Sequence, residues 1–111
     1  DRNDFEQQAP MILIEQPGPG EQVMDPVRIS GTANTFEATL QIEIIGPNGE
    51  MLYSGHDMAS SGTGTRGTFD LSIPIELDTE GWGTIRMFEY SARVGSRINV
   101  VEVPVQFVLE S

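Results

Sequence analysis

The side chains of this sequence that could perform acid–base or nucleophilic chemistry are few and poorly spaced for it. The only histidine, His56, is followed directly by Asp57 in an extended segment, where neighbouring side chains point to opposite faces of a sheet. A serine triad needs a carboxylate that orients the histidine, so this pair cannot serve one. There is no cysteine to act as a nucleophile or to bind zinc as a thiolate, and one imidazole does not make a zinc site. The sequence therefore predicts a protein that is not an enzyme, with no metal ligands and no cofactor.

Carboxylates are abundant, and two kinds of site could use them. Glu43, Glu89 and Glu102 could be nominated as acids for glycoside hydrolysis, but that chemistry needs a cleft that raises one pKa, and a small β-domain has little room for a cleft. Calcium could be bound by loop acids such as Asp78 and Glu80, although Asp-Thr-Glu-Gly lacks the fuller spacing of a dedicated calcium loop. We interpret these acids as turn carboxylates in water and leave a calcium ion open.

The elements that would position these residues are β-strands. Hydrophobic alternation of period two, broken by Gly and Pro, recurs along the chain, and no window combines a helical period with caps. The expected strands cover residues 11–15, 27–33, 38–45, 51–58, 67–76, 83–92 and 98–109. The last two form a hairpin about a turn at 94–97. This pattern predicts an all-β fold, a seven-stranded immunoglobulin-like antiparallel β-sandwich without a disulfide.

Face assignments follow from the same alternation. In the strand at 83–92 we expect Phe88 and Tyr90 to face the core, which leaves Glu89 outside within reach of an arginine. Trp82 stands at the corner before this strand, where it is expected to cover the end of the core.

Composition excludes some partners. The 111 residues carry 17 acids against six arginines and no lysine, a net charge of −11, so nucleic acid is not an expected partner. No apolar run approaches the roughly 20 residues that cross a bilayer, so the domain itself is not expected to be membrane-inserted.

We interpret residues 1–10 as a polar linker and 11–111 as the domain. Pro74, Glu102 and Pro104 should blunt the sheet edges, which predicts a monomer.

The loops should sort into two ends of opposite charge. If each strand reverses the last, the loops at 34–37, 59–66 and 93–97 share one end, and those at the other end carry acids and no arginine. The first end provides a candidate partner-binding surface of aromatic, acidic, hydroxyl and arginine side chains: Phe36, Glu37, Arg66, Arg93, Ser96 and Arg97. The simpler alternative is that Arg93 and Arg97 neutralise Glu37 or Glu89. Separately, Trp82, Tyr53 or Phe36 could stack on sugars.

Several short stretches carry a family resemblance. They are 14–20 (Ile-Glu-Gln-Pro-Gly-Pro-Gly), 30–34 (Ser-Gly-Thr-Ala-Asn), 36–38 (Phe-Glu-Ala), 67–69 (Gly-Thr-Phe), 88–91 (Phe-Glu-Tyr-Ser), 95–96 (Gly-Ser) and 103–105 (Val-Pro-Val). In this order and spacing the chain resembles the immunoglobulin-like domain of bacterial spore germination, found in envelope- and sporulation-associated bacterial proteins.

The resemblance implies a non-enzymatic, extracytoplasmic interaction module of the bacterial cell envelope, whose partner is a protein or a cell-wall component. It supplies no catalytic residues. Two alternatives stay open: a carbohydrate- or peptidoglycan-binding module that uses Trp82, Tyr53 or Phe36, and a loop-based protease inhibitor that presents residues 60–65.

Overall fold

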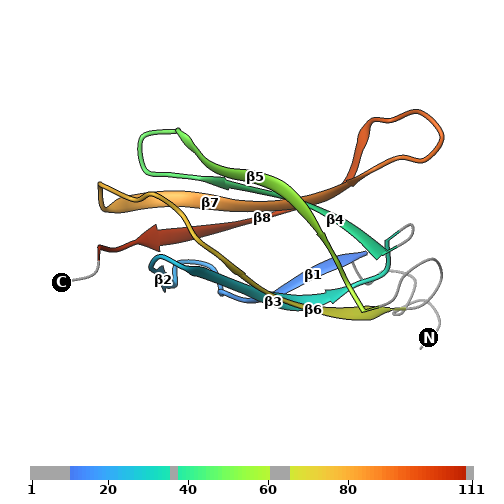
Figure 1. Ribbon diagram of the computed structural model, residues 1–111, viewed down its shortest axis with the longest axis horizontal. Coiled ribbons are helices and arrows are strands. Elements are labelled where there is room, and N and C mark those ends of the chain that lie inside the picture. The colour runs from blue at the N-terminus through green and yellow to red at the C-terminus, as the bar shows by residue number, and fades with distance from the viewer. Residues whose placement is uncertain (1–10, 36–37, 61–65, 110–111) are drawn as a thin grey trace.

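Two β-sheets packed face to face make up the domain (Figure 1). The computed structural model describes residues 11–35, 38–60 and 66–109. The strands are β1 (Ile12–Gln16), β2 (Gln22–Val23), β3 (Val27–Ala33), β4 (Thr39–Ile45), β5 (Met51–Met58), β6 (Gly67–Ile73), β7 (Gly81–Tyr90) and β8 (Arg97–Phe107). One sheet has the order β1-β3-β6 and the other β2-β8-β7-β4-β5. The expected immunoglobulin-like sandwich is confirmed, with eight strands instead of seven.

The additional strand is β2, in a segment that the sequence predicted to be a loop. Gln22 and Val23 pair in parallel with Gln106 and Phe107 at the end of β8. The carbonyl oxygens of Glu21 and Val23 each accept a hydrogen bond of 2.9 Å from the β8 side. A strand of two residues is too short to show an alternation, which is why the pattern missed it.

The core lies between the sheets and follows the predicted alternation on most strands. In β6, Phe69, Leu71 and Ile73 are buried while the side chains between them are exposed. Close contact between β1 and β3 depends on Gly31, because a Cβ atom there would lie 1.9 Å from the carbonyl oxygen of Leu13. Burial of these aliphatic and aromatic side chains is the main source of stability in such a fold.

Strand β7 packs against the core with the face that was predicted to lie outside. Met87 is opposite Ile42 across the sheet, and cross-strand partners share a face, so Met87 is fully buried with the core residues of β4. Phe88 and Tyr90 therefore lie on the outer face of the five-stranded sheet, which corrects the prediction for both aromatics. Glu89, predicted to lie outside, is buried.

Candidate binding surface at the arginine-bearing end

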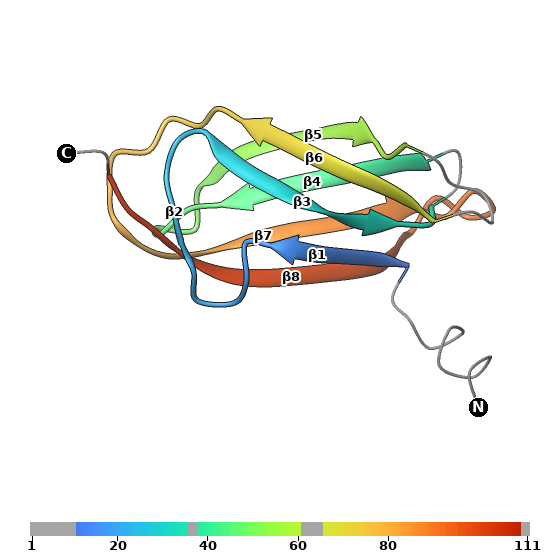
Figure 2. The ribbon, with the colours of Figure 1, turned by 90° about the horizontal axis from the view of Figure 1, so that it is seen from below.

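The described parts of the three loops predicted to share one end do lie together there (Figure 2). Two hydrogen bonds of 2.8 Å hold the connection that follows β5 at this end: the Ala59 amide donates to the Ala38 carbonyl just before β4, and the Ser60 amide donates to the Thr68 carbonyl on β6. Consecutive antiparallel strands place alternate connections at the same end, and this part of the strand-order argument works.

The β7–β8 hairpin is the most prominent element at this end. Its turn is closed by the Ser91 amide, which donates to the Ser96 carbonyl at 2.7 Å, so the turn begins earlier than predicted. Gly95 has a φ of 75°, a conformation that glycine adopts without strain. In Figure 1 the hairpin bends away from the three-stranded sheet. Val94, at its tip, is 78% exposed.

Arg97 does not belong to the tip but folds back over the outer face of the sheet. Its Nη1 and Nη2 atoms donate to the two carboxylate oxygens of Glu43 at 3.1 and 3.0 Å. Its guanidinium carbon lies 4.3 Å from the ring centroid of Phe88, a cation–π contact. The expectation that Arg97 neutralises Glu89 is therefore wrong, because its acceptor is Glu43 on β4.

A second arginine completes the site around Glu43. Arg86 donates from Nη1 to Glu43 at 2.9 Å and from Nε to Glu102 at 2.7 Å. Burial alone would raise the pKa of the Glu43 carboxyl, but hydrogen bonds from Arg86 and Arg97, and the attraction of both cations, outweigh it. The pKa of Glu43 therefore lies below its ordinary value. Hydrogen bonding to Glu102 and to Glu43 raises the pKa of Arg86.

Two aromatic rings extend this arrangement along β7. The rings of Phe88 and Tyr90 meet edge to face, with centroids 5.4 Å apart and planes at 86°. Phe88 is only 2% exposed although it lies on the outer face of a sheet, whereas about half of Tyr90 is open to water. We call Glu43, Arg86, Arg97, Phe88 and Tyr90 the arginine–aromatic cluster. It fixes the stem of the hairpin to the sheet.

Glu89 has a different role from the one predicted. It accepts a hydrogen bond of 2.8 Å from the side chain of Asn99. Asn99 has a φ of 55° at an irregularity in the pairing of β7 with β8. Asparagine tolerates this left-handed conformation better than most residues. The pair therefore belongs to a bulge that sets the path of the hairpin.

The other predicted partner-binding residues lie in three places. Arg66 donates to the Thr32 hydroxyl at 2.9 Å at the base of the loops. Arg93 stands at the hairpin tip, and its guanidinium has no hydrogen-bond or ion-pair partner among the residues that the structure describes. The backbone of Ser96 closes the turn. Phe36 and Glu37 lie outside the described residues, so their predicted roles remain predictions.

Two of the three candidates for glycan stacking, Trp82 and Tyr53, lie in the described residues and do not form one platform. Trp82 is opposite Gln106 on β8 and is 58% exposed, so it does not cover the end of the core as predicted. An added Cβ at Gly20 would lie 3.6 Å from its ring, so the indole lies beside this turn. Tyr53 packs against the core on β5. Of these two candidates, Trp82 is the one that offers an exposed face to a sugar.

At the acidic end of the sandwich, two carboxylates accept hydrogen bonds from backbone amides. Asp25 accepts from the Ile75 amide at 3.0 Å, and Glu80 accepts from the Leu109 amide at 2.9 Å. Within the described ranges, no three His, Cys, Asp or Glu side chains are grouped so that they could bind a metal ion. The described residues also contain no helix that is long and apolar enough to span a membrane.

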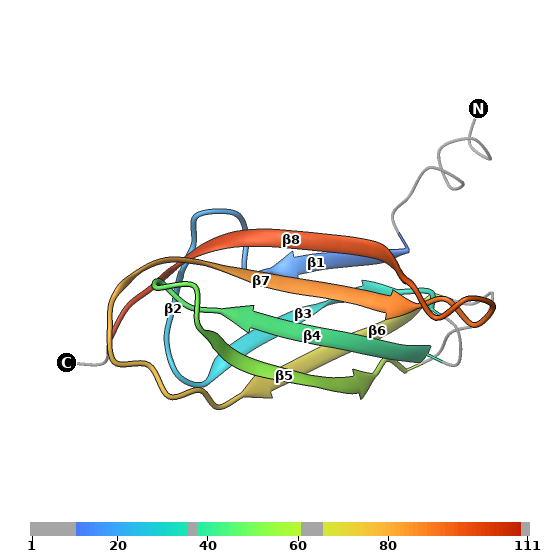
Figure 3. The ribbon, with the colours of Figure 1, turned by 90° about the horizontal axis from the view of Figure 1, so that it is seen from above.

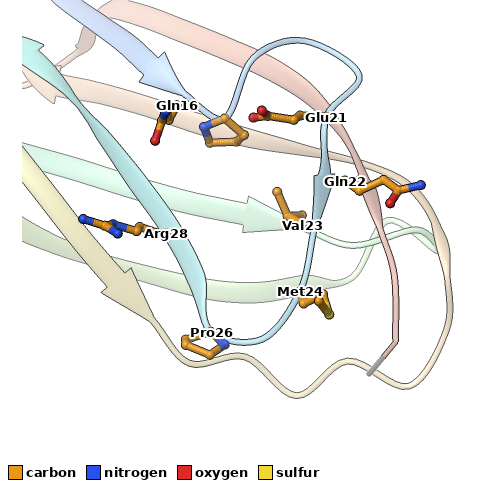
Figure 4. Close-up of a pocket in the computed structure, with 8 residues that line it drawn as sticks. Gln16, Glu21, Gln22, Val23, Met24, Pro26 and Arg28 are labelled. Atoms are coloured by element: carbon orange, nitrogen blue, oxygen red, sulfur yellow. The ribbon is translucent and has the colours of Figure 1, made fainter. Parts of the chain in front are cut away.

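A groove of about 390 Å³ between β1, β2 and β3 is a further hollow in this region (Figure 4). Its lining combines prolines, glutamines and one glutamate, Glu21, with Arg28. Figure 4 shows Arg28 pointing away from Glu21. Its guanidinium instead forms two hydrogen bonds with Asp70, at 3.0 and 2.7 Å. The groove thus brings together no pair of groups that could transfer a proton.

Comparison with known proteins supports the resemblance seen in the sequence. None of the curated proteins matches the chain. The profile of one family, described as the immunoglobulin-like domain of bacterial spore germination, matches residues 11–96, which include β1 to β7 and the hairpin turn. This is more than half of the chain, and the fold agrees with the family description. The chain belongs to the family of immunoglobulin-like domains of bacterial spore germination.

Proposed function

We propose that this domain is a non-enzymatic, extracytoplasmic interaction module of the bacterial cell envelope, and that it binds a protein or a cell-wall component through the tip of the β7–β8 hairpin. Family membership associates the domain with spore germination. The observation that carries the proposal is the hairpin tip itself, where the exposed Val94 lies next to Arg93.

The tip combines the two features of a recognition surface. Val94 offers apolar area, and Arg93 offers a planar cation that is suited to carboxylates. The arginine–aromatic cluster holds the hairpin stem, so less conformational entropy is lost on binding than with a mobile loop. Loops on a rigid sandwich often carry function in this way.

The distribution of charge on the domain indicates what kind of partner the hairpin tip would attract. The domain has a net charge of −11, so most of its surface repels an acidic partner, whereas Arg93 attracts one at the tip. An acidic or carboxylate-rich partner would therefore be oriented towards the hairpin. Complementarity of this kind contributes more to orientation and specificity than to affinity.

Co-sedimentation with insoluble peptidoglycan, whose peptides carry free carboxylates, tests the proposal for a cell-wall partner. Arg93→Glu should reduce the bound fraction, and added salt should weaken binding of the unchanged domain. Arg28→Glu is the matched control, because it changes the net charge equally on the other sheet. If the two variants lose binding equally, the effect is one of overall charge and the tip is not the site.

A carbohydrate-binding module is the second candidate, favoured by the exposure of Trp82 on the sheet surface. Loss of glycan-array binding in Trp82→Ala, with an unchanged denaturation curve, would support it over the hairpin.

The loop-based protease inhibitor stays a prediction, since residues 61–65 lie outside the described part of the chain. Absence of inhibition across a protease panel would count against it. The monomer also stays a prediction, and a sedimentation value independent of concentration would agree with it.

A further inference from the structure

Strand β5 forms an open edge of the five-stranded sheet. It contains eight residues and no proline, and β4 is its single neighbour in the described sheet order. The other edge strand of this sheet, β2, has two residues. Open edges present unpaired backbone donors and acceptors to other chains. The sequence had predicted blunted edges from Pro74 and Pro104, but neither residue is on β5.

The hydrogen bonds show which backbone groups of β5 are available. The Ala59 amide donates to Ala38 on the β4 side, whereas the Met58 amide is turned away and donates to the Asp57 side chain at 2.8 Å. Directions alternate along a strand. The amides and carbonyls of Ser54 and His56 therefore point away from β4, where an added strand would bond to them.

An acidic groove lies beside the start of the same strand. It has a volume of about 480 Å³ and is lined by Glu50, Glu76 and Asp78 together with Leu52 and the turn at 48–49. No arginine or histidine is among the residues that line it. Figure 3 shows the connection between β6 and β7 running past the start of β5. The groove and the open edge thus form one continuous surface.

We infer that the open edge of β5 binds an extended, positively charged segment of a partner protein, which adds to the sheet as a further strand and places an arginine or lysine in the acidic groove. Strand addition supplies affinity through main-chain hydrogen bonds and specificity through pockets for alternate side chains. A second copy of this chain is a poor occupant, because it would bring another net charge of −11 and the same acids to the edge. This surface is separate from the hairpin tip and binds a partner of opposite charge.

A labelled peptide of alternating arginine and valine is a suitable probe, with binding followed by fluorescence anisotropy. Amide hydrogen exchange measured by NMR should show new protection at Ser54 and His56. His56→Pro removes one outward donor and should weaken binding about tenfold, as expected for one strand hydrogen bond. His56→Ala is the matched control, since it removes the imidazole, keeps the amide and should bind as the unchanged domain does.

Two changes of the probe keep the test independent of folding of the variants. A peptide of alternating arginine and proline keeps the charge but lacks the donors of a strand, and should bind at least about tenfold more weakly. A peptide of alternating glutamate and valine should not bind, because its charge is repelled by the acidic groove. In the domain itself, the double variant Glu76→Gln with Asp78→Asn should reduce binding of the arginine peptide, and the reduction should be greatest at low salt.

Three results would overturn the inference. Equal binding of the arginine–proline peptide would mean attraction by charge alone. Absence of protection at Ser54 and His56 despite binding would place the peptide elsewhere. A dimer in sedimentation that His56→Pro dissociates would identify a second copy as the occupant of the edge.

Discussion

Replacement of Glu43 by glutamine should destabilise the domain more than loss of any exposed carboxylate on its surface. Glu43 is 6% exposed and accepts three hydrogen bonds from two arginines. Glutamine keeps the size of the side chain but removes the charge that both guanidinium groups require. Asp70→Asn is the matched control, because Asp70 also accepts two hydrogen bonds from one arginine, Arg28, but in water.

The magnitude follows from burial. Hydrogen bonds to charged groups contribute about 1.5–3 kcal/mol each when they are buried. The arginine side chains here are 29% and 45% exposed, and exposed ion pairs contribute about 0–1 kcal/mol, so water screens much of the gain. We expect Glu43→Gln to lower the free energy of unfolding by about 2 kcal/mol. Asp70→Asn should leave the unfolding midpoint almost unchanged, because Asp70 and its partner Arg28 both lie in water.

Urea denaturation at neutral pH measures the difference in stability between the two variants. The midpoint of Glu43→Gln should fall while its m-value stays unchanged. In a thermal scan, a loss of about 2 kcal/mol corresponds to a fall of about 8 °C for a domain of this size. Similar midpoints for Glu43→Gln and Asp70→Asn would refute the argument that burial makes the Glu43 cluster different from an exposed ion pair.

The pH dependence provides a second check. The folded-state pKa of Glu43 lies below its unfolded value, so the stabilisation is fully present above the unfolded pKa of about 4.3. It is lost as the pH falls through the lower folded pKa. The gap in stability between the unchanged domain and Glu43→Gln should therefore close in acid and stay constant at neutral pH. A gap that persists unchanged below the folded pKa would mean that the glutamine disturbs packing instead of charge.

Three further outcomes are expected. Gly31→Ala should cost about 3 kcal/mol or prevent folding, because its Cβ would lie 1.9 Å from a backbone oxygen, whereas Gly18→Ala meets nothing within 4 Å and should leave the urea midpoint unchanged. Phe88→Ala should cost about 3 kcal/mol in the same assay despite lying on an outer face, and a cost near zero would mean that the aromatic packing is unimportant. Acrylamide should quench the fluorescence of Trp82, the one tryptophan, nearly as well in the native protein as in urea, and strong protection would contradict its exposure.

Strands whose two faces differ in polarity could be predicted well from the sequence. The bounds expected for β3, 27–33, are those of the structure. Burial alternates along β3 as predicted, with Val27 and Ile29 in the core. In such strands one face is apolar and the other polar, so the period alone decides which side chains are buried.

Strand β7 could not be predicted in this way because both of its faces contain apolar side chains. Met87 on one face and Phe88 on the other are equally suited to a core, and aromatic content favoured the wrong one. The register with β4 decides, since Met87 pairs with Ile42. One signal was present: Glu43, outward on β4, needed a cation, and Arg86 is the residue paired with it across the sheet. That reasoning would have put Arg86 and Phe88 outside.

The same error explains why the two arginines of the hairpin were expected to behave alike. Because Phe88 lies on the outer face, its ring would be exposed to water unless another side chain packed over it. The Arg97 guanidinium packs over the ring and at the same time donates a hydrogen bond to Glu43. Arg97 is thus part of the folded structure of the stem, and Arg93, four residues earlier, is left as the cation of the tip. A change at Arg97 must therefore alter stability and the position of the tip together. A change at Arg93 alters only the charge that a partner meets, so Arg93 alone reports on recognition.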